Sequence, residues 1–397
     1  MALPPPNPFK PGAGRVPPEL AGRDALLDEV QSSLDEVVLE GEGARPFIIS
    51  GLRGVGKTVL LTEFARRAQD SKHSISIKLE AVAGGSLQLP LARAIHTQLR
   101  SLMSSGEVAR EKLSRALGVF KSFQLRVDPS GTYSFGFDVA PVPGMADTGD
   151  FEQDITDLLT ELGRSARDLG MGVLLAIDEL QNASKADLNG LNVALHNLGQ
   201  DVRPVPVSFI GAGLPSLPAV LADATSYAER LYDYRTIGLL EDAEARDALA
   251  HPVERRGIRW EPAALDAALA SVGGYPYFTQ ACGKHVWDVS SGTTIRLTDA
   301  LVGIQKARDE VDRGLYMSRW DRATQAQRAM MKAMAQDDDR PSAIQDLVSR
   351  LGKSRTSDLS VSRNELIKAG HIFPVDRGFV AFTVPGMADF IHRRIGD

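Results

Sequence analysis

Along residues 45–240, short apolar runs alternate with segments in which apolar residues recur at helical spacing. The clearest run is Gly172-Val173-Leu174-Leu175-Ala176-Ile177, which is typical of a strand buried on both faces of a parallel sheet. Such alternation of strands and helices predicts an α/β fold, a parallel sheet with helices on both faces. The other strands are expected at 47–49, 74–79, 205–210 and 235–239, and the main helices at 20–40, 57–69, 90–103, 151–169 and 185–199.

One segment within this region has a different pattern. Ser122–Val127 and Thr132–Val139 alternate polar and apolar residues around Asp128-Pro129-Ser130-Gly131, which is a turn sequence. We therefore expect residues 119–147 to be an insertion that forms a β-hairpin.

Beyond residue 240 the pattern becomes purely helical and then mixed. Helices are expected at 241–256, 262–272, 276–290 and 298–315, and they would form an all-helical lid over residues 241–318. The tail reads as helices at 323–335, 342–351 and 357–369, strands at 371–375 and 379–382, and a helix at 385–394. Three helices followed by a hairpin predict a winged helix-turn-helix at 319–397. The remaining divisions are a proline-rich extended leader at 1–18 and a core at 19–240.

Composition narrows the class of protein. The net charge of −6 argues against general affinity for nucleic acid or membranes, although one domain can differ. The single cysteine, Cys282, excludes a disulfide framework and a cysteine-based zinc site, and we interpret it as core filler in a reducing compartment. No apolar stretch approaches the roughly 18 residues that span a bilayer, and the leader lacks the apolar region of a signal peptide. We therefore expect a cytoplasmic protein.

The most specific chemical signal is a glycine-rich loop. Residues 51–58 fit the pattern G-x-x-x-x-G-K-[ST], after an expected strand and at the start of an expected helix. In that setting the backbone N–H groups and the helix N-terminus would hold a polyphosphate, Lys57 would reach the β- and γ-phosphates, and Thr58 would bind Mg²⁺. The alternative is a glycine-rich turn that carries a Lys-Thr pair by chance, and the flanking elements favour a nucleoside triphosphate. The expected contact residues are Gly51, Leu52, Arg53, Gly54, Val55, Gly56, Lys57, Thr58 and Val59.

Two acids end the buried apolar run. Asp178 would hold the Mg²⁺ ion, directly or through water, and Glu179 would orient and polarise the attacking water. Acid pairs are common at strand ends, so this pair indicates a Mg²⁺ and hydrolysis site only in combination with the phosphate loop upstream.

With these motifs in place, the chain resembles the AAA+/STAND group of P-loop ATPases, with a layout similar to origin-recognition proteins. Leu20-Ala21-Gly22-Arg23-Asp24 is similar to the family's hhGRE motif, with Asp for Glu, and the resemblance places Gly22 and Arg23 near the nucleotide base. Gly274-Tyr275-Pro276 matches the Gly-x-Pro of STAND lids, which implies that Pro276 lies near adenine. The alternative is an ordinary helix junction, where glycine ends one helix and proline begins the next.

The resemblance also bears on catalysis. Arg230 occupies a position where related ATPases often carry an arginine that approaches the γ-phosphate, commonly of a neighbouring subunit; otherwise it is an exposed helix residue. The fourth strand departs from the family, because it ends in Gly211-Ala212-Gly213 instead of a polar residue, and Ser208 lies too early. We therefore expect hydrolysis of ATP to ADP to be slow or completed by a partner.

Three functions remain open. The first is a nucleotide-controlled switch whose ATP or ADP state sets the winged-helix position and association with a protein partner or a second copy. The second is a DNA-binding AAA+ ATPase of the loader, transposition-helper or replication-initiator type. For it, residues 322–397 carry 12 Lys and Arg against 9 Asp and Glu, a small excess for duplex DNA. The third is a scaffold that holds ADP without turnover. None of them requires a membrane.

Overall fold

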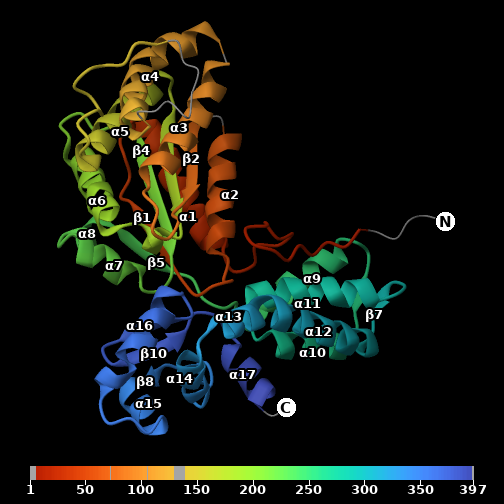
Figure 1. The fold of residues 1–397 in the computed structure, drawn as a ribbon. Coiled ribbons are helices and arrows are strands. Elements are labelled where there is room, and N and C mark those ends of the chain that lie inside the picture. Colours follow the sequence, from red (N-terminus) through yellow and green to blue (C-terminus); the bar gives the residue numbers. More distant parts are fainter. Residues whose placement is uncertain (1–5, 72, 105, 129–138, 396–397) are drawn as a thin grey trace.

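The centre of the molecule is a five-stranded parallel sheet (Figure 1). The computed structural model describes residues 6–71, 73–104, 106–128 and 139–395. The strand order is β2-β3-β4-β1-β5, so the two strands that precede the phosphate loop and the acid pair, β1 and β3, flank β4. The predicted α/β class is confirmed. The strands are β1 (Phe47–Ser50), β2 (Ser74–Glu80), β3 (Gly172–Asp178), β4 (Val207–Gly213) and β5 (Asp233–Thr236).

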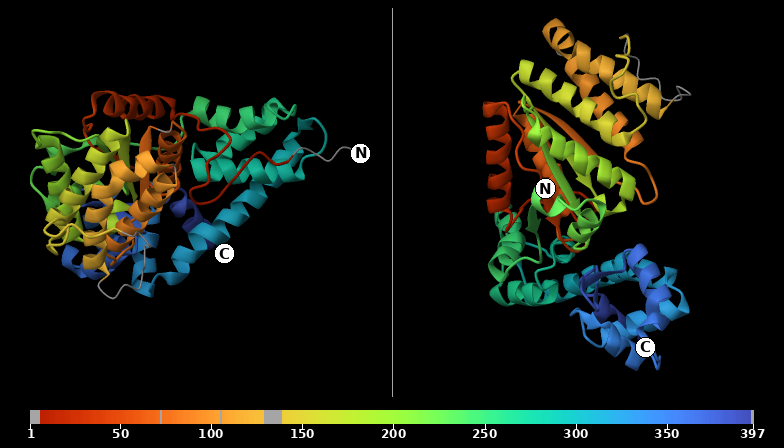
Figure 2. Two further views of the ribbon diagram at one scale, coloured as in Figure 1. Left: turned by 90° about the horizontal axis from the view of Figure 1, so that it is seen from above. Right: turned by 90° about the vertical axis from the view of Figure 1, so that its left-hand side faces the viewer.

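Both faces of the sheet are covered because alternate residues of its strands point in opposite directions. Leu175 and Ile177 of β3 pack in one core with α3, α4, α5 and α6, whereas Leu174 and Ala176 pack in another with α1 and α2. Figure 2 shows the red helix α1 on one side of the sheet and the yellow-green helices on the other. The covering helices are α1 (Asp24–Glu40), α2 (Lys57–Asp70), α3 (Gln88–Met103), α4 (Glu107–Val127), α5 (Phe151–Asp168) and α6 (Lys185–Gln200).

The predicted β-hairpin insertion is wrong in its first half. Residues 122–127 are the end of α4, whose buried Leu113, Leu117, Phe120 and Phe123 recur at helical spacing and pack in the core. Leu125, which a strand would place on the same face as Phe123, is 45% exposed. Packing of the whole helix thus overrides the local period-two pattern. Residues 132–138 of the expected second strand lie outside the described residues.

The lid consists of four helices and one small sheet. Strands β6 (Arg259–Trp260) and β7 (Thr294–Ile295) pair in parallel between the helices, so the prediction of helices alone was incomplete. After α12 the chain continues through a π-helical turn, η2, into α13 and the C-terminal part. The elements are α9 (Asp242–Glu254), α10 (Pro262–Val272), α11 (Pro276–Val289), α12 (Leu297–Val311), η2 (Asp312–Tyr316) and α13 (Met317–Arg322).

The C-terminal part combines helices with a three-stranded antiparallel sheet of order β8-β10-β9. The predicted helices and hairpin strands are present, with the short strand β8 in addition. One apolar core joins this part to the lid, and it includes the fully buried Cys282. The elements are α14 (Gln325–Ala335), β8 (Ser342–Ala343), α15 (Ile344–Arg350), η3 (Thr356–Leu359), α16 (Ser360–Lys368), β9 (Ile372–Asp376), β10 (Phe379–Phe382) and α17 (Met387–Ile395).

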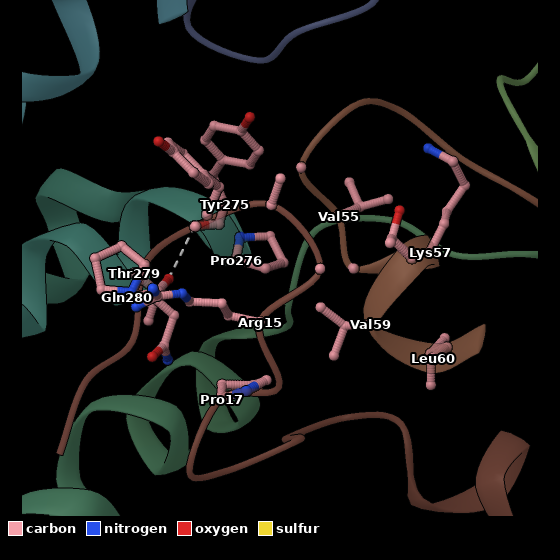
Figure 3. A pocket seen from close by; sticks show the side chains of 18 of the residues that line it. Arg15, Pro17, Val55, Lys57, Val59, Leu60, Tyr275, Pro276, Thr279 and Gln280 are labelled. Atoms are coloured by element: carbon pink, nitrogen blue, oxygen red, sulfur yellow. Dashed lines mark hydrogen bonds between the residues drawn. The ribbon is translucent and has the colours of Figure 1, made fainter. Parts of the chain in front are cut away.

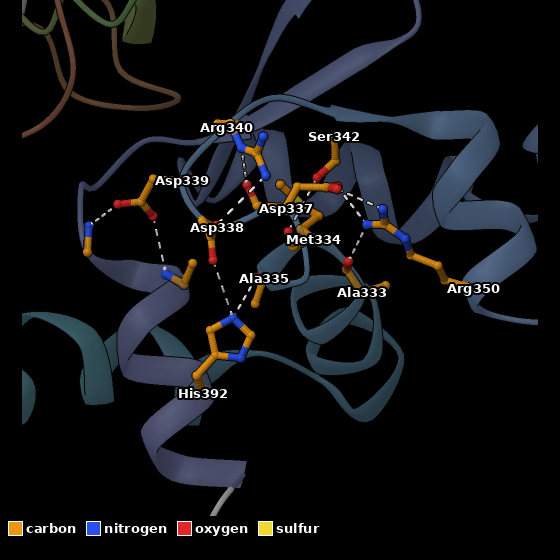
Figure 4. A network of polar contacts seen from close by, with 12 residues as sticks. Ala333, Met334, Ala335, Asp337, Asp338, Asp339, Arg340, Ser342, Arg350 and His392 are labelled. Atoms are coloured by element: carbon orange, nitrogen blue, oxygen red, sulfur yellow. Dashed lines mark hydrogen bonds and ion pairs between the residues drawn. The ribbon is translucent and has the colours of Figure 1, made fainter.

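A polar network fixes the ends of the C-terminal helices (Figure 4). The Arg350 guanidinium, at the end of α15, donates to both carboxylate oxygens of Asp337, at 2.6 and 2.7 Å, and to the carbonyl oxygen of Ala333 at 2.8 Å. His392 of α17 hydrogen-bonds to the carbonyl oxygen of Ala335 at 2.7 Å. Arg350 thus supplies a donor to the Ala333 carbonyl group near the end of α14, and the Ala335 carbonyl oxygen accepts from both His392 and the Asp338 amide.

Candidate nucleotide-binding site

The phosphate loop joins the end of β1 to the start of α2 at the carboxyl edge of the sheet. Gly54 and Gly56 have φ angles of +76° and +105°, which residues with a side chain rarely adopt. The amide of Gly51 donates to the carbonyl oxygen of Gly213 at 3.2 Å and so anchors the loop to β4. Helix α2 begins at Lys57, directly after the loop, so its N-terminal amides are available to an anion.

Lys57 is held inside the loop. Its side chain is 5% exposed, and its ammonium group donates to the carbonyl oxygens of Gly51 at 2.8 Å and Leu52 at 2.7 Å. Burial lowers the Lys57 pKa to about 8, while the nearby Glu179 and Asp178 act in the opposite direction. Anionic phosphate oxygens would favour the charged form of this buried lysine more than the neutral loop carbonyls do.

The acid pair lies where β3 ends. Asp178 is 3% exposed, and one of its oxygens accepts a hydrogen bond from the Glu179 amide at 2.9 Å. Its other oxygen accepts none from the described residues. The hard oxygen donors of Asp178 and Thr58 suit Mg²⁺, which would take its remaining ligands from phosphate and water. Glu179 has a left-handed backbone, φ +49°, which is uncommon for a residue with a side chain.

A cavity of 370 Å³ lies beside the loop, within the range of roughly 300–1,000 Å³ for small-molecule sites. Core, lid and N-terminal segment all contribute to its wall (Figure 3). Gly22, Gly51, Leu52 and Asp178 do not line it, although the carbonyl oxygens of Gly51 and Leu52 hold Lys57. The predicted residues that line the cavity are Arg23, Arg53, Gly54, Val55, Gly56, Lys57, Thr58, Val59, Glu179 and Pro276.

The lid is bonded to the loop through the Gly-Tyr-Pro junction. The Tyr277 amide donates to the carbonyl oxygen of Gly54 at 3.2 Å, and the Leu240 amide donates to that of Gly274 at 2.7 Å. Arg23 ties the same region together, because its guanidinium donates to the carbonyl oxygen of Gly238 at 2.7 Å. Pro276 is thus brought to the cavity by the contacts that dock the lid.

Arg230 is not brought to this cavity. It is exposed on α8 (Ala228–Leu231), ahead of β5. Asp233, at the start of β5, pairs with Phe47, whereas Thr236, at its end, pairs with Ser50 beside the loop. Arg230 therefore lies at the edge of the sheet opposite its own phosphate loop.

Sequence reasoning missed the N-terminal strap, which we define as residues 7–17. Phe9 is 4% exposed and packs against Gly283 of α11, and the Asn7 side chain donates to the carbonyl oxygen of Lys284 at 3.0 Å. Further along, the strap lines the cavity, and a Cβ on Gly14 would lie 3.1 Å from Thr58. Its proline-rich composition signals extended chain and gives no indication of what the chain covers.

A second missed feature joins the loop to the C-terminal part. The Arg53 amide donates to the carbonyl oxygen of Thr383 at 2.8 Å, and its guanidinium reaches Gly370, after α16. Arg319 of α13 lines the cavity, and burial and nearby Arg53 lower its pKa. The pKa of His371 is lowered to about 4 by burial and by the positive charges of Arg319, Arg53 and Arg322. No sequence motif marks these residues.

Comparison with known proteins agrees with this geometry. Residues 19–210 match the AAA ATPase domain family, and residues 313–391 match a domain family of unknown function, DUF8462. No curated protein sequence matches the chain. Together with the loop and the parallel sheet, the first match supports an AAA+ P-loop ATPase.

Two solved structures resemble the whole chain. A Walker-type ATPase of Pyrococcus abyssi is 14% identical, with 94% of this chain and 96% of that chain covered and a TM-score of 0.58. The Aeropyrum pernix ORC2 protein, solved as ADPNP–ADP complexes, is 13% identical, with 98% and 100% covered and a TM-score of 0.58. At this identity the likeness establishes the fold. Within the described residues, none of the helices combines the length and apolar character needed to cross a membrane.

Proposed function

We propose that the protein is a STAND-type ATP-binding switch, in which nucleotide at the phosphate loop sets the position of a C-terminal winged helix. The observation that carries this proposal is that one loop bonds to both other parts of the chain. Gly54 accepts a hydrogen bond from the lid at Tyr277, and the neighbouring Arg53 donates one to Thr383. A ligand that reshapes the loop therefore acts on the lid and the C-terminal part together.

The charges at this junction give the switch its sensitivity to phosphate. Arg53 Nε is buried and has no hydrogen-bond partner among the described residues. Arg53 and Arg319 both line the cavity. Anionic phosphate oxygens attract such donors, so a triphosphate and a diphosphate would hold the junction differently.

Small-angle scattering and mass measurement of the apo, ADP-bound and ATP-bound protein test the switch. We expect the scattering profile or the mass to change between ADP and ATP, and the change to vanish in Lys57→Ala, which loses the triphosphate. Superimposable profiles with unchanged mass in all three states would reject the switch.

We expect ATP hydrolysis to be slow, with Glu179 as the general base. Lys57 would contact the phosphates, and Thr58 and Asp178 would hold Mg²⁺ beside them. Arg230, which faces solvent in this chain, would serve the nucleotide of a neighbouring copy. Measurable phosphate release that Glu179→Gln abolishes is the expected result. Without such release the protein would hold its nucleotide as a scaffold.

A second function, binding of duplex DNA by the winged helix, is favoured by one observation. Four basic residues on or near α16 and the hairpin are exposed and form no ion pair in the described part of the chain: Lys353, Arg355, Lys368 and Arg377. Arg363, half-buried on α16, adds a fifth positive charge. The exposed apolar Val361, at 75%, lies on the same helix and weakens a DNA-facing role.

Binding of a labelled duplex at low and moderate salt tests this second function. We expect salt-dependent binding that is lost in Arg355→Glu/Arg363→Glu and kept in Arg340→Glu, which makes the same kind of charge reversal at one exposed position elsewhere in the domain. Absence of binding at low salt would exclude it.

A further inference from the structure

The Glu179 carboxylate is held by the side chain two residues further on. Gln181 lies in the short 3₁₀ helix η1 (Leu180–Asn182), directly after the acid pair. Its amide nitrogen donates to Glu179 Oε2 at 2.6 Å, and its amide oxygen accepts from the Leu214 backbone N–H at 3.0 Å. In the described part of the chain, no other residue hydrogen-bonds to this carboxylate.

The orientation of the Gln181 amide follows from its partners. A backbone N–H can only donate and a carboxylate can only accept, so the amide oxygen must face Leu214 and the nitrogen must face Glu179. A flipped amide would lose both hydrogen bonds. The side chain therefore spans from the acid pair to the end of β4 in one defined geometry.

The end of β4 is shaped to receive this amide. A Cβ on Gly213 would overlap Gln181 Oε1 and would also lie 2.8 Å from Leu217 Cδ2. Any larger residue at position 213 would displace the glutamine. The end of the fourth strand has no polar side chain, and a polar group reaches the same place from η1, the turn that follows β3.

We propose that Gln181 is the positioning residue for Glu179, and that it supplies from η1 the polar group that the end of β4 lacks. The proposal rests on the proposed ATPase activity. In that reaction the water oxygen bonds to the γ-phosphorus, the bond from this phosphorus to the β–γ bridging oxygen breaks, and the water proton passes to Glu179. With Oε2 fixed by Gln181, Oε1 is left to receive that proton, and the products are ADP and phosphate.

Gln181→Ala and Gln181→Met test the proposal under saturating ATP. Methionine keeps the length and bulk of glutamine but removes the amide, so it separates orientation from packing. We expect both variants to lower kcat for phosphate release by about tenfold or more, while KM and the Kd for ATP stay within about threefold. Asn182→Ala is the matched control, because it removes a hydrogen bond from the same turn to the carbonyl oxygen of Ala81.

These measurements distinguish failure of the positioning role from failure of the proposed ATPase activity. If Gln181→Met keeps the wild-type kcat, or if Gln181→Ala loses no more than Asn182→Ala, the positioning role is overturned while the ATPase stands. If the unaltered chain releases no phosphate above the Lys57→Ala background, the proposed ATPase activity and the positioning role are both rejected.

Discussion

Gly54 and Tyr275 are in such close contact that residue 54 has no space for a side chain. A Cβ on Gly54 would overlap the Tyr275 hydroxyl and lie 2.8 Å from two ring carbons. Tyr275 itself is 4% exposed, and burial raises the pKa of its phenol. The phosphate loop and the lid therefore meet through close packing of backbone against ring, so a change in the shape of the loop at Gly54 would be felt by the lid.

The first prediction concerns this contact. Gly54→Ala combines a clash with Tyr275 and a left-handed φ, so we expect ATP affinity to fall about tenfold or more, equivalent to about 1.4 kcal/mol. Isothermal titration calorimetry measures it. Gly84→Ala is the control, because its φ of +74° matches that of Gly54 while its Cβ would meet no atom within 4 Å. Equal losses in the two variants would show that the contact with Tyr275 has no role.

The second prediction is a pH dependence of nucleotide affinity. The Lys57 pKa is lowered to about 8 in the free protein, and bound phosphate would raise it because an anion favours the charged lysine. Below pH 8 the lysine is charged in both states and affinity is flat. Above pH 8 binding must take up a proton, so affinity should fall by up to about tenfold per pH unit.

Calorimetry in buffers of different ionisation enthalpy measures this proton uptake directly. Lys57→Arg provides the control, because its guanidinium stays charged and its weaker affinity should not change with pH over this range. Constant wild-type affinity from pH 7 to 9.5 would contradict the assignment of the perturbed group.

The sequence predicted the elements whose pattern is local. Continuous apolar residues in β3 and the glycine spacing at 51–58 require only neighbours along the chain, and both are where we expected them. Residues 122–127 were misread because their pattern fits a strand over six residues, while the 21 residues of α4 as a whole fit a helix. The longer helix buries more apolar surface, and this burial favours the helix over the short strand pattern.

Contacts between distant segments could not be predicted. The hydrogen bond from Arg53 to Thr383 joins residues that no periodicity relates, and Phe9 packs against Gly283, which lies more than 270 positions further along the chain. Gln181 combines local and distant contacts. It is two residues from Glu179, the predicted base, but its proposed role also depends on Gly213, which is on another strand.

The third prediction concerns the stability of the C-terminal part. Arg350→Ala removes two charge-assisted hydrogen bonds to Asp337 and one to Ala333, so we expect the free energy of unfolding to fall by about 1–3 kcal/mol. Urea titration measures it. Arg340→Ala is the control. Its side chain is 78% exposed, lies 3.8 Å from the Asp338 carboxylate and donates to the backbone carbonyl oxygen of Asp337 at 3.2 Å; such exposed contacts contribute less than about 1 kcal/mol.

The same pair predicts an acid dependence. The hydrogen bond from Arg350 lowers the Asp337 pKa below its usual 3.8, so the carboxylate stabilises the fold above that pH and less as pH falls through the folded-state pKa. The difference between wild type and Arg350→Ala should therefore narrow from pH 7 to pH 3. A constant difference would mean that Arg350 acts through Ala333 alone.

The fourth prediction concerns the N-terminal strap. The strap lines the cavity and is fixed to α11 by the buried ring of Phe9 and by the bond from the Lys10 amide to Gln280 at 3.2 Å. A nucleotide held beneath it would leave only when the strap moves. Phe9→Ala removes the main apolar anchor, so we expect release of a fluorescent ADP, chased with excess ATP in stopped flow, to be about tenfold faster.

Faster release of ADP could also come from a less stable lid, so a control variant that destabilises the lid without changing the strap is needed. Val286→Ala removes a fully buried side chain from the core around the same helix, α11, without being part of the strap. Its release rate should stay near the wild-type value although its stability falls, because the strap keeps its anchor. If Phe9→Ala and Val286→Ala accelerate release equally, the lid controls the exit of nucleotide and the strap only follows it.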